Sequence, residues 1–227
     1  MRAASSAVSG GVRLAARLLR LLGGLALYSL GIALTLRARV GYAPWDVFHT
    51  GLAAALGMSI GFASILTGLA VVLVSLALGE RIGLGTLGNM ALIGLMLDAF
   101  LASGLVPLAS GPLTGAAMMA AGLFVIAFAT YLYMSSGFGS GPRDGLMVAL
   151  TRKTKLPIGL VRALIEITAV LVGWRLGGLV GWGTVAAALG AGLCIQLVFA
   201  LLRFDAKAIR HESLGESLGL RARREGR

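Results

Sequence analysis

The sequence repeats itself at a spacing of 98 residues. That shift places the stretch 41–46, Gly-Tyr-Ala-Pro-Trp-Asp, on the stretch 139–144, Gly-Ser-Gly-Pro-Arg-Asp. The same register continues without a gap through matched glycines and threonines: Ile60-Gly61 on Ile158-Gly159, Gly79 on Gly177, Gly83 on Gly181, Gly85-Thr86 on Gly183-Thr184, and Gly94 on Gly192. Such a duplication in an apolar chain predicts two related membrane bundles packed about a pseudo-two-fold axis.

The composition is that of a membrane protein. Of the 227 residues, 58% are hydrophobic and only 13% are charged, about half the charged share of a soluble domain. Four long stretches carry no Asp, Glu, Lys or Arg: 21–36, 47–79, 100–142 and 176–202. Apolar runs of this length cross a bilayer as helices. The net charge of +11 comes largely from Lys and Arg beside these runs, so it does not indicate nucleic-acid binding.

The apolar runs and breaks predict an all-α, polytopic bundle of two duplicated, inverted halves, each with three spans and one short helix. The predicted organisation is a disordered N-terminus (1–12), a first repeat (13–104), a connection (105–112), a second repeat (113–203) and a charged cytoplasmic tail (204–227). Spans are expected at about 14–37, 60–78, 84–104, 113–134, 157–176 and 182–203, and the short segments at 44–56 and 142–152.

The two short segments decide the topology, because neither is long enough to span a bilayer in the usual way. Each opens with a proline, Pro44 or Pro142, which is favoured at the first helical position. Each has an aspartate in its first turn, Asp46 or Asp144, where it complements the helix dipole. They are predicted to be re-entrant or interfacial, giving six spans; eight spans in parallel repeats is the alternative.

The distribution of basic residues favours six spans with both termini in the cytoplasm. Arg13, Arg17 and Arg20 precede the first apolar run, and 143–155 carries four more basic residues. Six spans place these groups and the 80–81 turn inside. Eight spans move Arg81 and Arg143 outside, which fits the positive-inside rule less well.

Asp46 and Asp144 are the first candidate site residues. In one interpretation, the two short helices begin near the membrane midplane and face each other, so that their N-termini form a polar site. In the other, Pro plus Asp is simply a good helix start, and both helices lie flat at the interface. The apolar stripe Trp45, Phe48 and Leu52 fits that second interpretation.

Glu166 is the second candidate, because a bare charge inside a span costs at least about 2.5–3.5 kcal/mol. Arg162 lies one turn earlier and could pair with it. The pair is either a structural ion pair or part of a site. Its first-half equivalents, Ser64 and Gly68, are uncharged, so the shared fold does not require it.

The remaining polar residues are weaker candidates. Asn89, Asp98 and Gln196 are expected to lie behind the site or, for Asp98, to reach the headgroups. His49 follows Asp46 by three residues and has no second His or Cys nearby, so no metal site is expected, and no cofactor either. No catalytic arrangement is evident, so the chain is not expected to be an enzyme. The predicted substrate-binding residues are Pro44, Trp45, Asp46, His49, Pro142, Arg143, Asp144, Arg162 and Glu166.

Three blocks carry a family resemblance. They are residues 41–52 (GYAPWDVFHTGL) with 59–61 (SIG), residues 78–87 (LGERIGLGTL), and residues 139–146 (GSGPRDGL). The chain resembles, from Leu18 to Arg203, the YczE/YyaS/YitT-like group of bacterial integral membrane proteins. The resemblance implies a bacterial cytoplasmic (inner) membrane protein and brings no established substrate or catalytic residue.

Two functions follow from the pattern. The first is a small-solute or ion transporter with a polar site between the repeats. The alternative is a non-transporting membrane protein that assembles with or regulates another protein. The expected partners are the lipid bilayer, an unidentified solute or ion, and a protein partner or a second copy. A transporter requires Asp46, Asp144 and Glu166 to face one shared space, whereas a scaffold would bury them in separate pairs.

Overall fold

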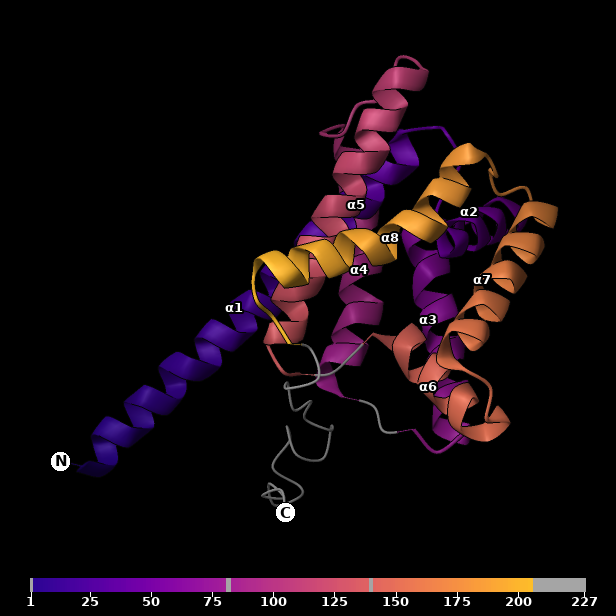
Figure 1. The fold of residues 1–227 in the computed structure, drawn as a ribbon. Coiled ribbons are helices and arrows are strands. Elements are labelled where there is room, and N and C mark those ends of the chain that lie inside the picture. The colour runs from indigo at the N-terminus through magenta and orange to yellow at the C-terminus, as the bar shows by residue number, and fades with distance from the viewer. Residues whose placement is uncertain (1, 81–82, 139–140, 206–227) are drawn as a thin grey trace.

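The computed structural model describes residues 2–80, 83–138 and 141–205, and in these residues the fold is all-helical, as predicted (Figure 1). The helices are α1 (Arg2–Arg37), α2 (Pro44–Leu56), α3 (Ile60–Ala77), α4 (Leu84–Ser103), α5 (Pro112–Ser135), α6 (Pro142–Thr154), α7 (Ile158–Arg175) and α8 (Trp182–Leu201).

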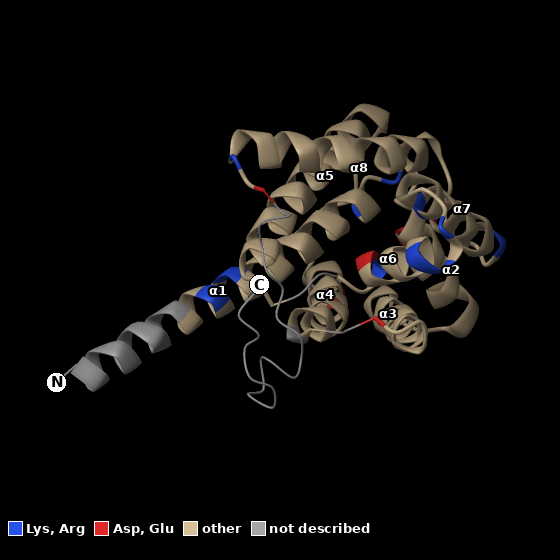
Figure 2. Cartoon of the chain, turned by 60° about the horizontal axis from the view of Figure 1, so that its bottom comes forward, with Lys and Arg blue, Asp and Glu red and all other residues tan. Residues whose placement is uncertain are grey.

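Five of these helices are long and apolar enough to cross a membrane: α1 over Leu14–Arg37, α3, α4 over Gly85–Ser103, α5 and α8. The sixth predicted span is α7. It has 18 residues but carries Arg162, Glu166 and Arg175, so it is less apolar than the other five. Figure 2 shows Lys and Arg on α1, α6, α7 and some helix ends, while α4, α5 and α8 are nearly free of charge along their length.

The two terminal predictions have different outcomes. α1 begins at Arg2, so the structure places residues 2–12 in a helix and not in the predicted disordered segment; this helix projects away from the bundle (Figure 1). The predicted cytoplasmic tail lies outside the described residues from position 206 onward.

The centre of the bundle is the antiparallel pair of α1 and α5. Their backbones touch at two glycines: a Cβ added at Gly31 would lie 3.0 Å from the carbonyl oxygen of Gly122, and one added at Gly122 would lie 2.8 Å from that of Gly31. Small residues allow this approach, which is a common way to pack helices in lipid. Leu25, Ile32, Ile93 and Leu97 complete a core between α1 and α4.

Contacts between distant segments define one end of the bundle, here called the Glu80 end. Arg17 donates to the carbonyl of Ser136 (2.8 Å), the amide of Gly85 donates to the carbonyl of Phe138 (2.8 Å), and Arg152 forms an ion pair with Glu80 (2.8 Å). The beginning of α4 and the ends of α5 and α6 therefore lie together.

The opposite end, here called the Arg37 end, is defined in the same way. Arg37 donates to the carbonyl of Leu101 (2.7 Å), and the amide of Ala109 donates to the carbonyl of Arg37 (3.0 Å). The amide of Tyr42 donates to the carbonyl of Leu179 (3.2 Å), which brings the α7–α8 connection to this end.

Neither short helix passes from one end to the other. α2 follows Tyr42 at the Arg37 end, and the chain returns there at Ser59, which bonds to Asp98. α6 follows Phe138 at the Glu80 end and returns to it at Arg152. Both helices therefore enter and leave on the same side. Eight spans would separate Glu80 from Arg152 by the membrane, so these contacts contradict that alternative.

Of the two short helices, α2 lies inside the bundle, whereas α6 buries only Pro142 and Ala149. On α2, Asp46, Val47, His49 and Ala53 are buried, which does not fit a helix lying flat on an interface. α2 packs mainly against α7, and α6 packs against α3; α4 packs on α1, and α8 on α5. These reciprocal pairings are compatible with the predicted repeat, which itself stays a prediction.

Candidate polar cavity

A partly open cavity of about 370 Å³ lies in the middle of the bundle, lined by residues of all eight helices. The predicted substrate-binding residues all line it: Pro44, Trp45, Asp46, His49, Pro142, Arg143, Asp144, Arg162 and Glu166. The structure therefore brings together groups that come from two segments about a hundred residues apart in the sequence.

The beginnings of α2 and α6 meet at this cavity. Each helix starts at its proline after extended backbone: Ala43 has φ −59° and ψ 152°, and Gly141 has φ −64° and ψ 160°. The guanidinium of Arg143 lies over the ring of Trp45, 4.7 Å from its centroid, a cation–π contact between the first turns of the two helices. The positive ends of both helix dipoles thus lie at one region of the cavity.

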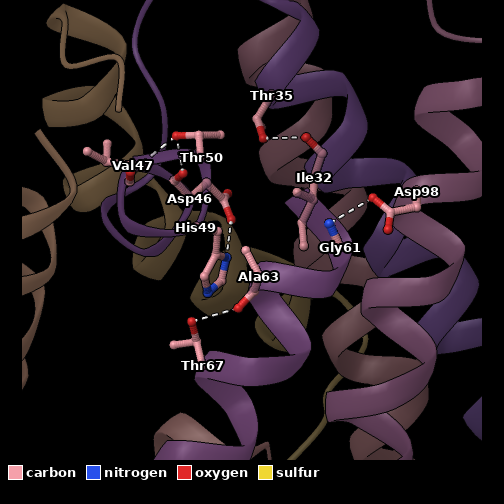
Figure 3. A network of polar contacts seen from close by, with 10 residues as sticks. All are labelled: Ile32, Thr35, Asp46, Val47, His49, Thr50, Gly61, Ala63, Thr67 and Asp98. Atoms are coloured by element: carbon pink, nitrogen blue, oxygen red, sulfur yellow. Dashed lines mark hydrogen bonds and ion pairs between the residues drawn. The ribbon is translucent and has the colours of Figure 1, made fainter. Parts of the chain in front are cut away.

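Asp46 and His49 form the buried part of the site. Asp46 is 4% exposed to solvent and His49 is 2% exposed. Asp46 Oδ1 lies 3.5 Å from His49 Nδ1 (Figure 3). Thr50 donates to the carbonyl of Asp46 (2.7 Å) and fixes the first turn of α2. Because a buried carboxylate needs polar partners, the His49 ring is a suitable neighbour for Asp46.

Arg162 and Glu166 form the predicted ion pair on α7, with Arg162 Nε 2.8 Å from Glu166 Oε1. The pair faces the cavity: the Arg162 side chain is 46% exposed and that of Glu166 is 21% exposed. An intramembrane pair that faces a cavity retains access to water or to a ligand, which lowers the cost of keeping charge in the membrane.

Asn89 and Asp144 meet at the start of α6. A Cβ added at Gly141 would lie 3.5 Å from Asn89 Oδ1 and 3.6 Å from Asp144 Oδ2, so both side chains flank this glycine. Asn89 therefore lines the cavity beside the predicted binding residues and does not lie behind them.

Asp98 and Gln196 are placed elsewhere than expected. Asp98 belongs to α4, and its side chain lies beside the beginning of α3. There it accepts hydrogen bonds from the amide of Gly61 (2.8 Å) and the hydroxyl of Ser59 (Figure 3). Its carboxylate thus accepts from one backbone N–H and one hydroxyl at the start of a neighbouring helix, and it is not among the residues that line the cavity. Gln196 is exposed on α8 and is also not among the lining residues.

Sequence reasoning missed the hydroxyl groups of the cavity. Tyr28 and Tyr133 form an edge-to-face pair with centroids 6.2 Å apart, and both line the cavity, as do Thr67 and Thr130. The available signal was a tyrosine inside the first span of each half: Tyr28 in the middle of 14–37 and Tyr133 near the end of 113–134. A single hydroxyl in an apolar run was too weak to be distinguished from packing.

The described residues thus form a helical bundle with five helices long and apolar enough to span a membrane, two short helices and a polar cavity where these two begin, which defines a polytopic membrane protein. The chain belongs to the family of unknown function DUF6198, whose model matches residues 15–200. This match covers the whole described bundle except the first turns of α1, the last residue of α8 and the residues that follow it.

The relatives agree with this assignment. The chain is 34% identical over 175 residues to the uncharacterized membrane protein YczE of Bacillus subtilis, covering 76% of this chain and 80% of the relative. It is 35% identical to an uncharacterized protein of Haemophilus influenzae, over 80% of this chain and 83% of the relative. It is 25% identical to the uncharacterized protein YyaS of Bacillus subtilis, over 79% of this chain and 90% of the relative. The resemblance drawn from the motifs is confirmed. No solved structure matches the chain.

Proposed function

We propose that this protein is a transporter of a small solute or ion and that the central cavity is its binding site. One observation carries the proposal: Asp46, Asp144 and Glu166 all line the same cavity. Asp46 and Glu166 each have a partner, His49 and Arg162, but both pairs line one shared cavity, whereas a scaffold protein would have been expected to bury them apart from each other. Re-entrant helices whose N-termini meet inside a bundle are also a recurring construction of transporter binding sites.

The cavity offers groups of both signs. The positive ends of the α2 and α6 dipoles and the guanidinium of Arg143 favour negative charge on a ligand. The carboxylates of Asp46, Asp144 and Glu166 favour a cation or a proton. Among the described lining residues there are three carboxylates and two guanidinium groups, so neither sign dominates once the helix N-termini are included.

Flux measurements in liposomes test the proposal. The purified full chain is reconstituted and screened for proton-coupled uptake of ions, amino acids and other small metabolites. We expect flux from the wild type and at least a tenfold loss in Glu166→Gln and Asp144→Asn. The matched control is Glu80→Gln, which removes a Glu–Arg pair of the same length outside the cavity. A folded wild type with no flux over the panel would favour the assembly or regulatory role instead.

We also propose that the protein lies in a bacterial cytoplasmic membrane with the Glu80 end in the cytoplasm. This end carries Arg17, Arg152, Lys153 and Lys155, as the positive-inside rule requires. Single cysteines at Ser110 and Thr154, in a Cys194→Ala background, test the arrangement with a membrane-impermeant thiol reagent. Thr154→Cys should react from the cytoplasmic side and Ser110→Cys from the other; labelling of both from one side would contradict it.

A further inference from the structure

The cavity has two chemically different walls. α8 contributes only apolar residues to the lining: Ala187, Ala188, Ala191, Ile195 and Phe199. Leu123 and Ile126 of α5 extend this apolar wall. The charged groups come from α2, α6 and α7. A ligand that fills the whole space therefore needs an apolar part against α8 and a polar part against the short helices.

The polar wall can hold a head group that carries both signs. An anionic group suits the helix N-termini beside Arg143. A cationic group suits Asp46 and Glu166 together with the aromatic rings of Tyr28 and Tyr133, since carboxylates and π-faces both attract cations. These features lie in one cavity of about 370 Å³, which is near the low end of the range of about 300–1,000 Å³ for small-molecule sites.

The cavity also has a side on which the described residues form no extensive helix–helix contact. Its lining includes Arg162, Ile165 and Glu166 of α7 and the apolar residues of α8. Yet α7 packs mainly against α2, and α8 mainly against α5, and the two helices diverge from their connecting turn (Figure 1). A Cβ added at Gly159 or Gly192 would meet nothing else in the described chain within 4 Å.

We propose that the cavity binds a single-chain amphiphile with a zwitterionic head, which enters from the bilayer between α7 and α8. The head lies against the starts of α2 and α6 and the Arg162–Glu166 pair, and the chain lies along α8. A chain-bearing ligand can reach this site without leaving the lipid, which explains why the apolar wall faces the open side. The inference rests on the proposed function and specifies its substrate class.

Photo-cross-linking tests the site directly. The full chain in phosphatidylglycerol nanodiscs is incubated with a lysophosphatidylcholine whose acyl chain carries a diazirine. After irradiation, cross-linked peptides are mapped by mass spectrometry. The competitors share one twelve-carbon chain and differ in head: dodecylphosphocholine, dodecyltrimethylammonium and dodecyl sulfate. Phosphocholine without a chain is the fourth competitor.

We expect cross-links in α8 around Ala188–Ile195, and competition by dodecylphosphocholine at a concentration at least about tenfold lower than by the other two amphiphiles. Phosphocholine alone should not compete. Ala191→Phe, which fills the apolar wall, should lower the cross-link yield about tenfold. Leu189→Phe is the matched control, because Leu189 is 70% exposed on the outer face of the same helix. If Ala191→Phe does not fold, Ala188→Leu replaces it.

Three results would overturn the inference. Equal competition by all three amphiphiles, or cross-links that Ala191→Phe leaves unchanged, would mean that the probe only samples the lipid-facing surface. Competition by phosphocholine alone would mean that the chain contributes nothing. In each case, flux of a water-soluble solute that Glu166→Gln abolishes would leave the proposed transporter standing, so the two failures are distinguishable.

Discussion

The contact between α3 and α4 and the separation of α7 from α8 make the clearest contrast in the molecule. α3 and α4 touch through Gly61 and Gly94, where a Cβ added at Gly61 would overlap the Gly94 carbonyl oxygen. The residues 98 positions later, Gly159 and Gly192, have open space in front of them. Identical glycines therefore do not guarantee that two helices pack.

The difference lies in the residues around the glycines. In the first pair, Ser59 and Asp98 tie the beginning of α3 to α4. Their counterparts at the same spacing are Pro157, which has no side-chain donor, and Gln196, which is exposed. The second pair also carries the Arg162–Glu166 charges where the first has Ser64 and Gly68. Hydrogen bonds thus hold α3 against α4, whereas α7 and α8 lie apart beside the Arg162–Glu166 pair.

The largest expected effect on stability comes from disturbing the contact between Gly61 and Gly94. Gly61→Ala should destabilise the protein by about 3 kcal/mol, because the new methyl group meets backbone that cannot move aside. Gly159→Ala should be neutral or stabilise by about 0.5–1 kcal/mol, since alanine favours a helix over glycine. Thermal unfolding of both variants in the same detergent measures the difference. Equal losses would show that α7 and α8 pack as α3 and α4 do.

A smaller effect is expected at the aspartate that holds α3. Asp98→Ala leaves the amide of Gly61 and the hydroxyl of Ser59 without their acceptor, which should cost about 1–3 kcal/mol. Gln196→Ala should change stability by less than about 0.5 kcal/mol because Gln196 is exposed. The same unfolding assay applies. An equal response to the two substitutions would remove the contrast between the helix pairs.

The smallest effect is expected from transplanting the contact. The double variant Pro157→Ser with Gln196→Asp places the Ser59 and Asp98 chemistry on the open pair. It should bring α7 closer to α8 in part of the molecules and slow thiol labelling of Cys194, the native cysteine of α8, about two- to fivefold. Ser59→Pro with Asp98→Gln is the reverse control and should not slow it. Unchanged labelling by the transplant would mean that these two residues do not decide the closure.

The sequence predicted the short helices well because their signals are local. Proline at the first position and aspartate in the first turn located α2 and α6, and α2 has the predicted bounds; α6 continues two residues further, to Thr154. The position of the charged cavity residues also followed from the sequence, because a charge inside an apolar run requires a polar space.

Other features depended on contacts that no local pattern encodes. Asp98 became a partner of α3 because α4 passes the first turn of that helix, which cannot be read from α4 alone. The open α7–α8 side was unpredictable because the repeat preserves both glycines. Residues 2–12 were predicted to be disordered from their small, polar composition, whereas the structure continues α1 through them.

The backbone contact between α2 and α7 has a mechanical consequence. A Cβ added at Gly173 would lie 2.5 Å from the backbone nitrogen of Phe48, and one at Gly178 would lie 3.0 Å from the carbonyl carbon of Val47. Gly173 lies on α7 and Gly178 just after it, so α2 has backbone contact with both α7 and the connection that follows it. We expect a displacement of α7 to displace α2 as well, which would couple the width of the entrance to the position of Asp46.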